Sequence, residues 1–318
     1  MTKYIIQRLI AAAFAFIIII AVCFFVLYSM PGSIISNPTI KDETVIKKIE
    51  EKYHLNEPLP VQFGYFIKDY MNFDFGESLV VRPGVKVFDV IKERINVTIQ
   101  LNVFSALFTL PIGMFFGITM ALKKDSVYDY ICSSIVILVI SAPSFVIAAV
   151  LQYFLAYKLG WFPLTLAPIV ELNWEKFYSM ILPIFAMSFG SIASISRMLR
   201  AELSEVLTSD YMLLAKAKGL TYSQTIVRHA LRNACVPLAS TFLYLFVWVI
   251  SSSLVIENIF GVPGLSKVLV SAINARDHQL TLGVTYFYTL IGLLMAIAAD
   301  LSYGVVDPRI RMGAKKDG

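Results

Sequence analysis

Six long stretches of the chain contain no Asp, Glu, Lys or Arg, and polar segments separate them. Each stretch exceeds the roughly 18 apolar residues that a helix needs to cross the hydrocarbon of a bilayer. The pattern therefore predicts six transmembrane helices, within residues 9–40, 95–122, 130–157, 177–196, 233–256 and 279–299. The first stretch is too long for a signal-peptide core and no small-residue cleavage site follows it, so we expect it to be retained.

The distribution of basic residues predicts the orientation, because Lys and Arg accumulate on the cytoplasmic side of a membrane protein. If the N-terminus lies inside, the short outer loops hold only Lys158, Lys176, Lys267 and Arg276. The inner segments then hold the remaining cations of the short loops and tails. These are Lys3, Arg8, Lys123, Lys124, Arg197, Arg200, Lys216, Lys218, Arg228, Arg232, Arg309, Arg311, Lys315 and Lys316. We therefore expect both termini in the cytoplasm.

This topology divides the chain into four parts. The expected parts are an N-terminal tail with the first transmembrane helix (1–30), an external subdomain (31–95), a five-span core (96–306) and a cytoplasmic tail (307–318). In the external part, polar and apolar residues alternate with helical periodicity from Asp42 to His54, which predicts an amphipathic helix that Pro58 and Pro60 end. The core contains one long cytoplasmic loop, 197–235.

Composition narrows the class of protein. Hydrophobic residues make up 58% of the 318 residues and charged residues 15%, against about a quarter in a soluble domain. The net charge of +5 is accounted for by the inner flanks, so we expect anionic lipid rather than nucleic acid as the partner of that charge. No glycine is followed by lysine, which excludes a phosphate-binding loop of the usual kind.

The same sequence contains few residues that could do chemistry inside the membrane. The expected spans lack the buried charges of proton relays and ion-coupled carriers, and Asp300 is the nearest exception. The three cysteines and three histidines do not have the paired spacing of a metal site, so we expect no catalytic residue and no metal ligand. What remains is a passive pathway that another protein drives.

The segment 211–220 has the form of a docking element. Ser209 or Asp210 can cap the first turn of a short basic helix, and Gly219 can take the left-handed conformation that ends it. Thr221 and Gln224 then form a capping box that starts a second helix, which we expect to run to about Asn233. An ordinary solvated connector between two spans is the alternative interpretation.

This loop resembles the EAA motif of the binding-protein-dependent permeases of ABC importers. Ala215 stands at the second alanine and Gly219 at the glycine, while Leu213 and Leu214 replace the glutamate and the first alanine. The long form, with Pro237 well after Gly219, is similar to the oligopeptide, dipeptide and nickel subfamily. Other segments resemble the B-type permease of that subfamily in order along the chain. They are 53–59, 73–78, Arg94 with Thr98 and Leu101, 257–265, 275–277 and 307–311.

The resemblance implies an all-helical, six-span permease of the type I ABC importer fold in a prokaryotic inner membrane, with an external subdomain after the first span. It also implies four kinds of partner: a second, different permease, two cytoplasmic ATPases that hold ATP and Mg, an extracytoplasmic substrate-binding protein, and membrane lipid. This chain itself would hold no cofactor. The helix before the glycine would dock in a cleft of an ATPase, which makes the coupling candidates Tyr211, Leu214, Ala215, Lys216, Lys218 and Gly219.

Polar side chains within the spans are candidates for lining a transport pathway, although hydroxyls in helices commonly bond their own carbonyls. The selected candidates are Asn102, Ser141, Ser144, Ser251, Ser252, Ser253 and Glu257, and the serine triplet is preferred. We further expect Gly113 and Gly117 to let two helices approach closely, within this chain or against the second permease. Pro143 should kink the third span. Arg197 and Arg200 should extend toward lipid phosphates.

The expected cargo is a dipeptide or oligopeptide. Within the same subfamily, nickel or a metal chelate is the alternative cargo. A self-contained channel or carrier is the alternative from a different class, and it would function when reconstituted alone.

Overall fold

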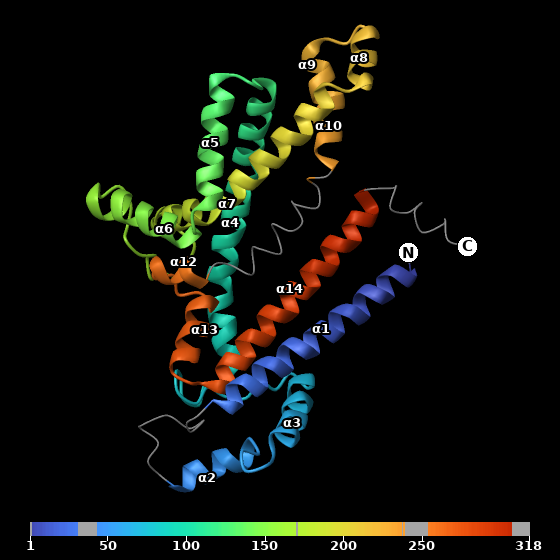
Figure 1. Ribbon diagram of the computed structural model, residues 1–318. Helices are drawn as coiled ribbons and strands as arrows, with labels where there is room; N and C mark the ends of the chain where they lie inside the picture. The colour runs from blue at the N-terminus through green and yellow to red at the C-terminus, as the bar shows by residue number, and fades with distance from the viewer. Residues whose placement is uncertain (1, 31–42, 170, 237, 239–253, 307–318) are drawn as a thin grey trace. The chain divides into compact units, whose positions relative to one another are not determined.

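The structure is a computed structural model that describes residues 2–30, 43–169, 171–236, 238 and 254–306. Every regular element in these ranges is a helix, apart from one isolated antiparallel bridge between Glu77 and Lys86. The chain divides into two compact units. One comprises Thr2–Thr98 and Pro263–Leu294, and the other comprises mainly Ile99–Val262 and Met295–Gly318. Figure 1 labels the helices of both units.

Four described helices are long and apolar enough to cross a membrane, and a bent pair adds a fifth if it forms one span. The four are Ile5–Ser29, Val87–Leu122, Trp174–Leu207 and His278–Asp300. They coincide with the first, second, fourth and sixth expected stretches. Most of the fifth expected stretch, 233–256, lies outside the described residues.

The third expected span is the bent pair. Helix α5 (Val127–Ser141) is followed by α6 (Ser144–Leu151), which continues as the π-helical segment η1 (Gln152–Lys158). The helix direction bends by 106° between the two arms. Pro143 is the N-cap of α6, with φ −57° and ψ 134°, a conformation outside the helical region. The predicted proline kink is therefore confirmed, and it is sharp enough to separate two helices.

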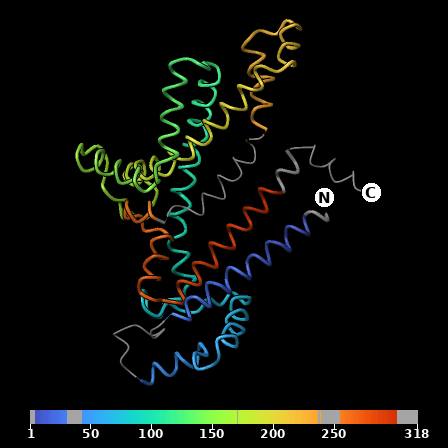
Figure 2. Tube along the Cα trace, viewed as in Figure 1, coloured from blue at the N-terminus to red at the C-terminus, as the bar shows by residue number. Residues whose placement is uncertain are grey.

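The unit built from both ends of the chain contains α1 (Thr2–Ser29), α2 (Glu43–Lys52), α3 (Leu59–Met71), the start of α4 (Val87–Leu122), α13 (Leu265–Asn274) and the first part of α14 (His278–Val306). In Figures 1 and 2, α1 lies beside α14, and the Phe16 and Tyr286 rings meet edge to face at 4.9 Å. The core combines aliphatic and aromatic residues, and Phe24, Phe66 and Tyr70 are buried together in it. The expected amphipathic helix is confirmed as α2. Pro58 directly precedes α3, and Pro60 lies in its first turn, where proline is well tolerated.

The other unit is organised around α7 (Trp174–Leu207). Helices α5 and α6 pack on α7, and so do α10 (Leu231–Ala234) and α12 (Leu254–Ile259). Helix α4 approaches α7 at its two glycines: a Cβ on Gly117 would lie 2.8 Å from Cβ of Leu199, and one on Gly113 would lie 2.9 Å from Ile195. The Gly113 and Gly117 face thus packs within this chain.

Candidate functional site

The candidate coupling segment, residues 208–225, begins where α7 ends. Helix α8 (Asp210–Ala217) starts after Ser209, which has an extended backbone with φ −77° and ψ 154°. Its hydroxyl does not cap α8, and instead donates a hydrogen bond to the carbonyl of Val206, 2.5 Å away. The expected side-chain cap is therefore wrong for Ser209, because its hydroxyl terminates the preceding helix.

The C-terminal end of α8 is closed by backbone geometry. Gly219 has φ +82°, a region that glycine enters without a steric penalty. The amide of Leu220 bonds the carbonyl of Ala215 at 3.4 Å, and the amide of Gly219 bonds the carbonyl of Lys216 at 3.0 Å. These two bonds are those of a Schellman motif. The predicted left-handed glycine is confirmed.

A second helical run begins immediately afterwards. The Thr221 hydroxyl accepts from the amide of Gln224, and the Gln224 side chain accepts from the amide of Thr221, so the predicted capping box is confirmed. The run continues through α9 (Tyr222–Thr225), the π-helical segment η2 (Ile226–Ala230) and α10. Ala230 and Ala234 are buried in one cluster with Leu199 and Leu203 of α7. This packing fixes the coupling segment to α7.

Helix α8 has two distinct faces. Met212 and Ala215 are buried, whereas Leu213 is 62% exposed and Leu214 57% exposed. The exposed residues between 211 and 219 are Tyr211, Leu213, Leu214, Lys216, Ala217, Lys218 and Gly219. Ala215 therefore packs on the buried side of α8 and is not available to a partner. Leu213 is exposed, although the candidates selected from the sequence did not include it. Its exposure could have been inferred from the spacing of three between Met212 and Ala215, which places Leu213 on the other face.

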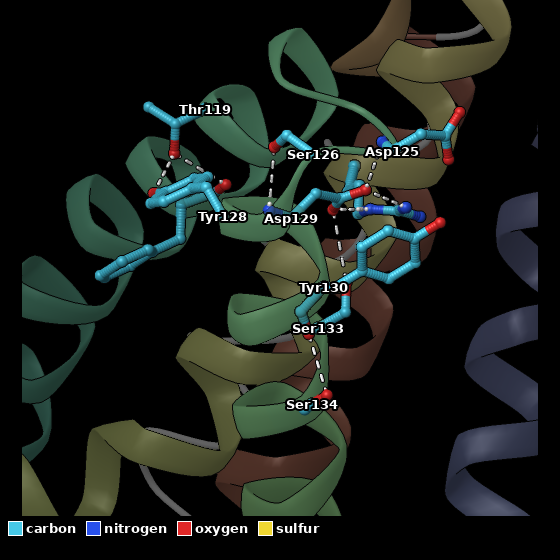
Figure 3. Close-up of polar contacts among 10 residues, drawn as sticks. Thr119, Asp125, Ser126, Tyr128, Asp129, Tyr130, Ser133 and Ser134 are labelled. Atoms are coloured by element: carbon cyan, nitrogen blue, oxygen red, sulfur yellow. Dashed lines mark hydrogen bonds and ion pairs between the residues drawn. The ribbon is translucent and has the colours of Figure 1, made fainter.

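A buried ion pair joins α5 to α7. Nε and Nη2 of Arg200 lie 2.5 and 2.6 Å from the two carboxylate oxygens of Asp129, a bidentate geometry. Asp129 is fully buried, and its carboxylate also accepts from the Asp125 amide and the Ser133 hydroxyl. Figure 3 shows Ser126 and Ser133 around Asp129 at the start of α5. The expectation that Arg200 extends toward lipid is wrong, because Asp129 holds its guanidinium.

The pathway candidates fall into different environments. Asn102 is buried in α4, and one turn further the hydroxyls of Ser105 and Ser188 lie 2.9 Å apart. Ser141 and Ser144 are exposed on either side of the bend between α5 and α6. Glu257 is fully buried on α12. The triplet Ser251, Ser252 and Ser253 lies outside the described residues, so its role stays a prediction.

A second polar site, which sequence reasoning did not find, joins two distant segments. The buried carboxylate of Asp277 accepts a hydrogen bond from the Ser78 hydroxyl at 2.6 Å. It also accepts from the amides of Leu79, Val80, Val81 and Leu280, at 3.0 to 3.3 Å. We call these residues the Asp277 cluster. It fixes the turn that follows Ser78 to the loop between α13 and α14.

Comparisons with known proteins cover nearly the whole chain. Residues 113–312 match the family described as binding-protein-dependent transport system inner membrane component, and residues 1–102 match the N-terminal region of such membrane components. The chain is similar to the dipeptide transport system permease protein DppB of Bacillus subtilis (strain 168), with 35% identity over 99% of this chain and 100% of that protein.

Two further comparisons involve another permease and a solved structure. The oligopeptide transport system permease protein OppB of Haemophilus influenzae is 35% identical over 98% of this chain and 100% of its own length. A crystal structure of an amino acid ABC transporter with histidines aligns with a TM-score of 0.48 and 17% identity, and the alignment covers 68% of this chain and 94% of that one.

Proposed function

Since the chain belongs to the family of binding-protein-dependent transport system inner membrane components, and is a permease subunit of a bacterial ABC importer, we propose that its cargo is a dipeptide or oligopeptide. One observation carries this proposal. The permeases named for dipeptide and oligopeptide transport match at 35% identity over their entire length. A full-length match supports a shared role better than a match of one segment.

The family also indicates how the subunit works. It is a translocation subunit rather than a catalytic one, and a binding-protein-dependent system implies a substrate-binding protein and an ATPase as partners. We extend this to a second, different permease beside this chain and two cytoplasmic ATPases that hold ATP and Mg. We also propose six spans with both termini in the cytoplasm, in contact with membrane lipid. The 43–98 region would then face the substrate-binding protein.

The coupling segment is proposed to dock on an ATPase. Its exposed leucines, Leu213 and Leu214, offer apolar area that is unusual on a solvated connector, and Lys216 and Lys218 flank them. The Schellman motif and the capping box hold the backbone at both ends of the turn, and the buried alanines anchor the following run to α7. A rigid, anchored element of this kind can transmit a movement of the ATPase to the spans.

The pathway proposal remains with the residues selected from the sequence: Asn102, Ser141, Ser144, Ser251, Ser252, Ser253 and Glu257. Exposure of Ser141 and Ser144 at the bend supports their access to a cargo or to the second permease. Hydroxyls at a break in a span can also satisfy the carbonyls that the proline leaves without a donor.

Cargo is tested by uptake. Cells that lack this chain should lose import of a radiolabelled dipeptide or tetrapeptide and regain it with the wild-type chain, while nickel import stays unchanged. Loss of nickel import with intact peptide import would instead favour the metal alternative. Transport by the purified chain alone, without ATPase, would support the self-contained carrier and contradict the proposal.

Coupling is tested separately with Gly219→Pro. Proline fixes φ near −65° where the chain needs +82°, and it deletes the amide that bonds Lys216, so peptide uptake and ATPase association should both be lost. The control is Gly190→Ala, because Gly190 lies inside α7 with no atom within 4 Å of an added Cβ. Normal uptake by a correctly inserted Gly219→Pro variant would mean that the segment is only a connector.

A further inference from the structure

A cavity of about 270 Å³ lies in the unit that contains α1, α2 and α3. Its volume lies just below the range for small-molecule sites, which is about 300 to 1,000 Å³, so it has room only for a small ligand. Aromatic side chains from α1, from α3 and from the turn after α2 form most of its walls, and the 74–76 turn completes them. The lining residues are Phe24, Tyr28, Lys52, Tyr53, His54, Gln62, Tyr65, Phe66, Asp69, Tyr70, Asp74, Gly76 and Gln279.

Two buried polar atoms at this cavity have no hydrogen-bond partner within the described part of the chain. The amide nitrogen of Gln62 donates to the carbonyls of Leu55 and Glu57, at 3.2 and 2.7 Å, which fixes the amide and leaves Oε1 unpartnered. The hydroxyl of Tyr70 is unpartnered as well, and burial raises the pKa of Tyr70 well above its usual value. Unsatisfied groups of this kind are rare in folded proteins, and here both atoms belong to the core beneath the cavity rather than to its open surface.

Charge at the cavity favours a cation. Asp69 and Asp74 are the two acids of the lining, and Lys52 is its only Lys or Arg. Nζ of Lys52 lies 3.1 Å from a carboxylate oxygen of Glu77, which offsets its charge. The same Nζ lies 5.4 Å from the centre of the Tyr53 ring, so the rim already places one cation over an aromatic face.

We propose that this cavity binds a small organic cation, an ammonium group on an apolar or aromatic body. The rings of Tyr53, Phe66 and Tyr70 receive the body, because aromatic faces attract both apolar groups and cations. The two aspartates attract its charge. The site is separate from the coupling segment and does not depend on which cargo is imported.

The test uses the purified full chain in lipid nanodiscs and two probes of equal size. We expect 2-phenylethylammonium to bind and its neutral counterpart, 2-phenylethanol, to bind at least about fivefold more weakly. The double variant Asp69→Asn, Asp74→Asn should reduce that preference several-fold, because two exposed charges each contribute modestly. Asparagine keeps an oxygen that can accept from the Gly76 amide as Asp74 does, so the turn should persist.

A control variant distinguishes binding in the cavity from a general effect of removing negative charge. Glu51→Gln removes an exposed acid of α2 that does not line the cavity, and it should leave both affinities unchanged. Thermal melting confirms that each variant is folded. Equal affinity for the two probes, absence of binding, or an equal effect of Glu51→Gln would overturn the proposal.

A displacement experiment shows whether the natural ligand is a free amine or the amino end of a peptide. A free amine and the amino end of a short peptide share this chemistry, so phenylalanyl-alanine and its N-acetyl form are added to the bound probe. Displacement by the free dipeptide alone assigns the site to peptide amino ends. If neither form displaces the probe, the site takes free amines.

Discussion

The coupling segment and the Asp277 cluster are two turns that are fixed by opposite means. In the coupling segment, hydrogen bonds join residues three to five positions apart, and most side chains remain exposed. In the Asp277 cluster, one buried carboxylate holds a turn almost 200 residues away in the sequence. The first turn is closed by backbone conformation, and the second by one charged side chain.

This difference has a consequence for how each turn tolerates change. A turn fixed by local geometry leaves its side chains available for a partner, so its surface can change at little cost to the fold. A turn fixed by one buried acceptor concentrates its stability in a single residue, because buried donors that lose their acceptor each cost about 1 to 3 kcal/mol. Substitutions should therefore affect stability strongly in the Asp277 cluster and weakly in the coupling segment.

The largest effect is expected for Asp277→Ala. Four amides and the Ser78 hydroxyl lose their acceptor, so the free energy of unfolding should fall by at least about 3 kcal/mol. Thermal melting in detergent measures this change. Asp69→Ala, which alters an exposed acid of the same unit, is the control and should change stability little. If Asp277→Ala hardly changed the free energy of unfolding, the proposed difference between the two turns would be wrong.

A smaller effect is expected for Arg200→Met. Asp129 stays buried without its charged partner, which should cost about 2 to 3 kcal/mol, a discounted figure because Arg200 is partly exposed. Arg197→Met, one turn earlier on the exposed face of α7, is the matched control. The pair Asp129→Leu, Arg200→Met should recover part of the loss. Equal destabilisation by Arg197→Met would contradict the role of the ion pair.

Gly219→Ala should cost about 1 to 2 kcal/mol. Its added Cβ meets no atom within 4 Å, so the cost comes only from the backbone at φ +82°. Gly190→Ala, in the middle of α7, should be neutral or slightly stabilising because alanine favours a helix. Chemical unfolding of both variants measures the difference. If the two changes behave alike, the Schellman geometry does not restrict this position.

The smallest effect on stability is expected for Lys216→Gln with Lys218→Gln, below about 1 kcal/mol because both side chains are exposed. Association with the ATPase should nevertheless weaken, and more so at low salt, where exposed charges act most strongly. Pull-down at two salt concentrations gives the comparison. A large loss of folded protein would show that these lysines stabilise the chain itself.

The same contrast explains what the sequence could predict. The glycine turn, the capping box, the proline bend and α2 each depend on residues within a few positions, and each prediction is confirmed. The Asp277 cluster and the Asp129 pair depend on which distant segments meet, and no local pattern encodes that. The predicted Ser209 cap is wrong for a related reason. Its hydroxyl could either accept from an amide of α8 or donate to a carbonyl of α7, and it donates to the Val206 carbonyl of α7.

The cavity near α3 was equally hidden in the sequence. Its aromatic residues read as ordinary core positions, and the unpartnered oxygen of Gln62 results from the particular carbonyls that its amide nitrogen bonds. Leu213 is different, because helical periodicity places it opposite Met212 and Ala215, although the residues selected from the sequence did not include it. The sequence therefore located the coupling segment, and the structure resolved which of its side chains are exposed.

The bend at Pro143 has a consequence for the lipid around this subunit. Helix α5 contains 15 residues, about 22 Å at 1.5 Å per residue, while the hydrocarbon core is about 30 Å thick. After a turn of 106°, α6 no longer extends along the same axis. Acyl chains in contact with α5 alone would therefore have to compress to match this short arm, at a small elastic cost for each ångström of mismatch. A bilayer with a hydrocarbon core thinner than about 30 Å would match the length of α5 more closely.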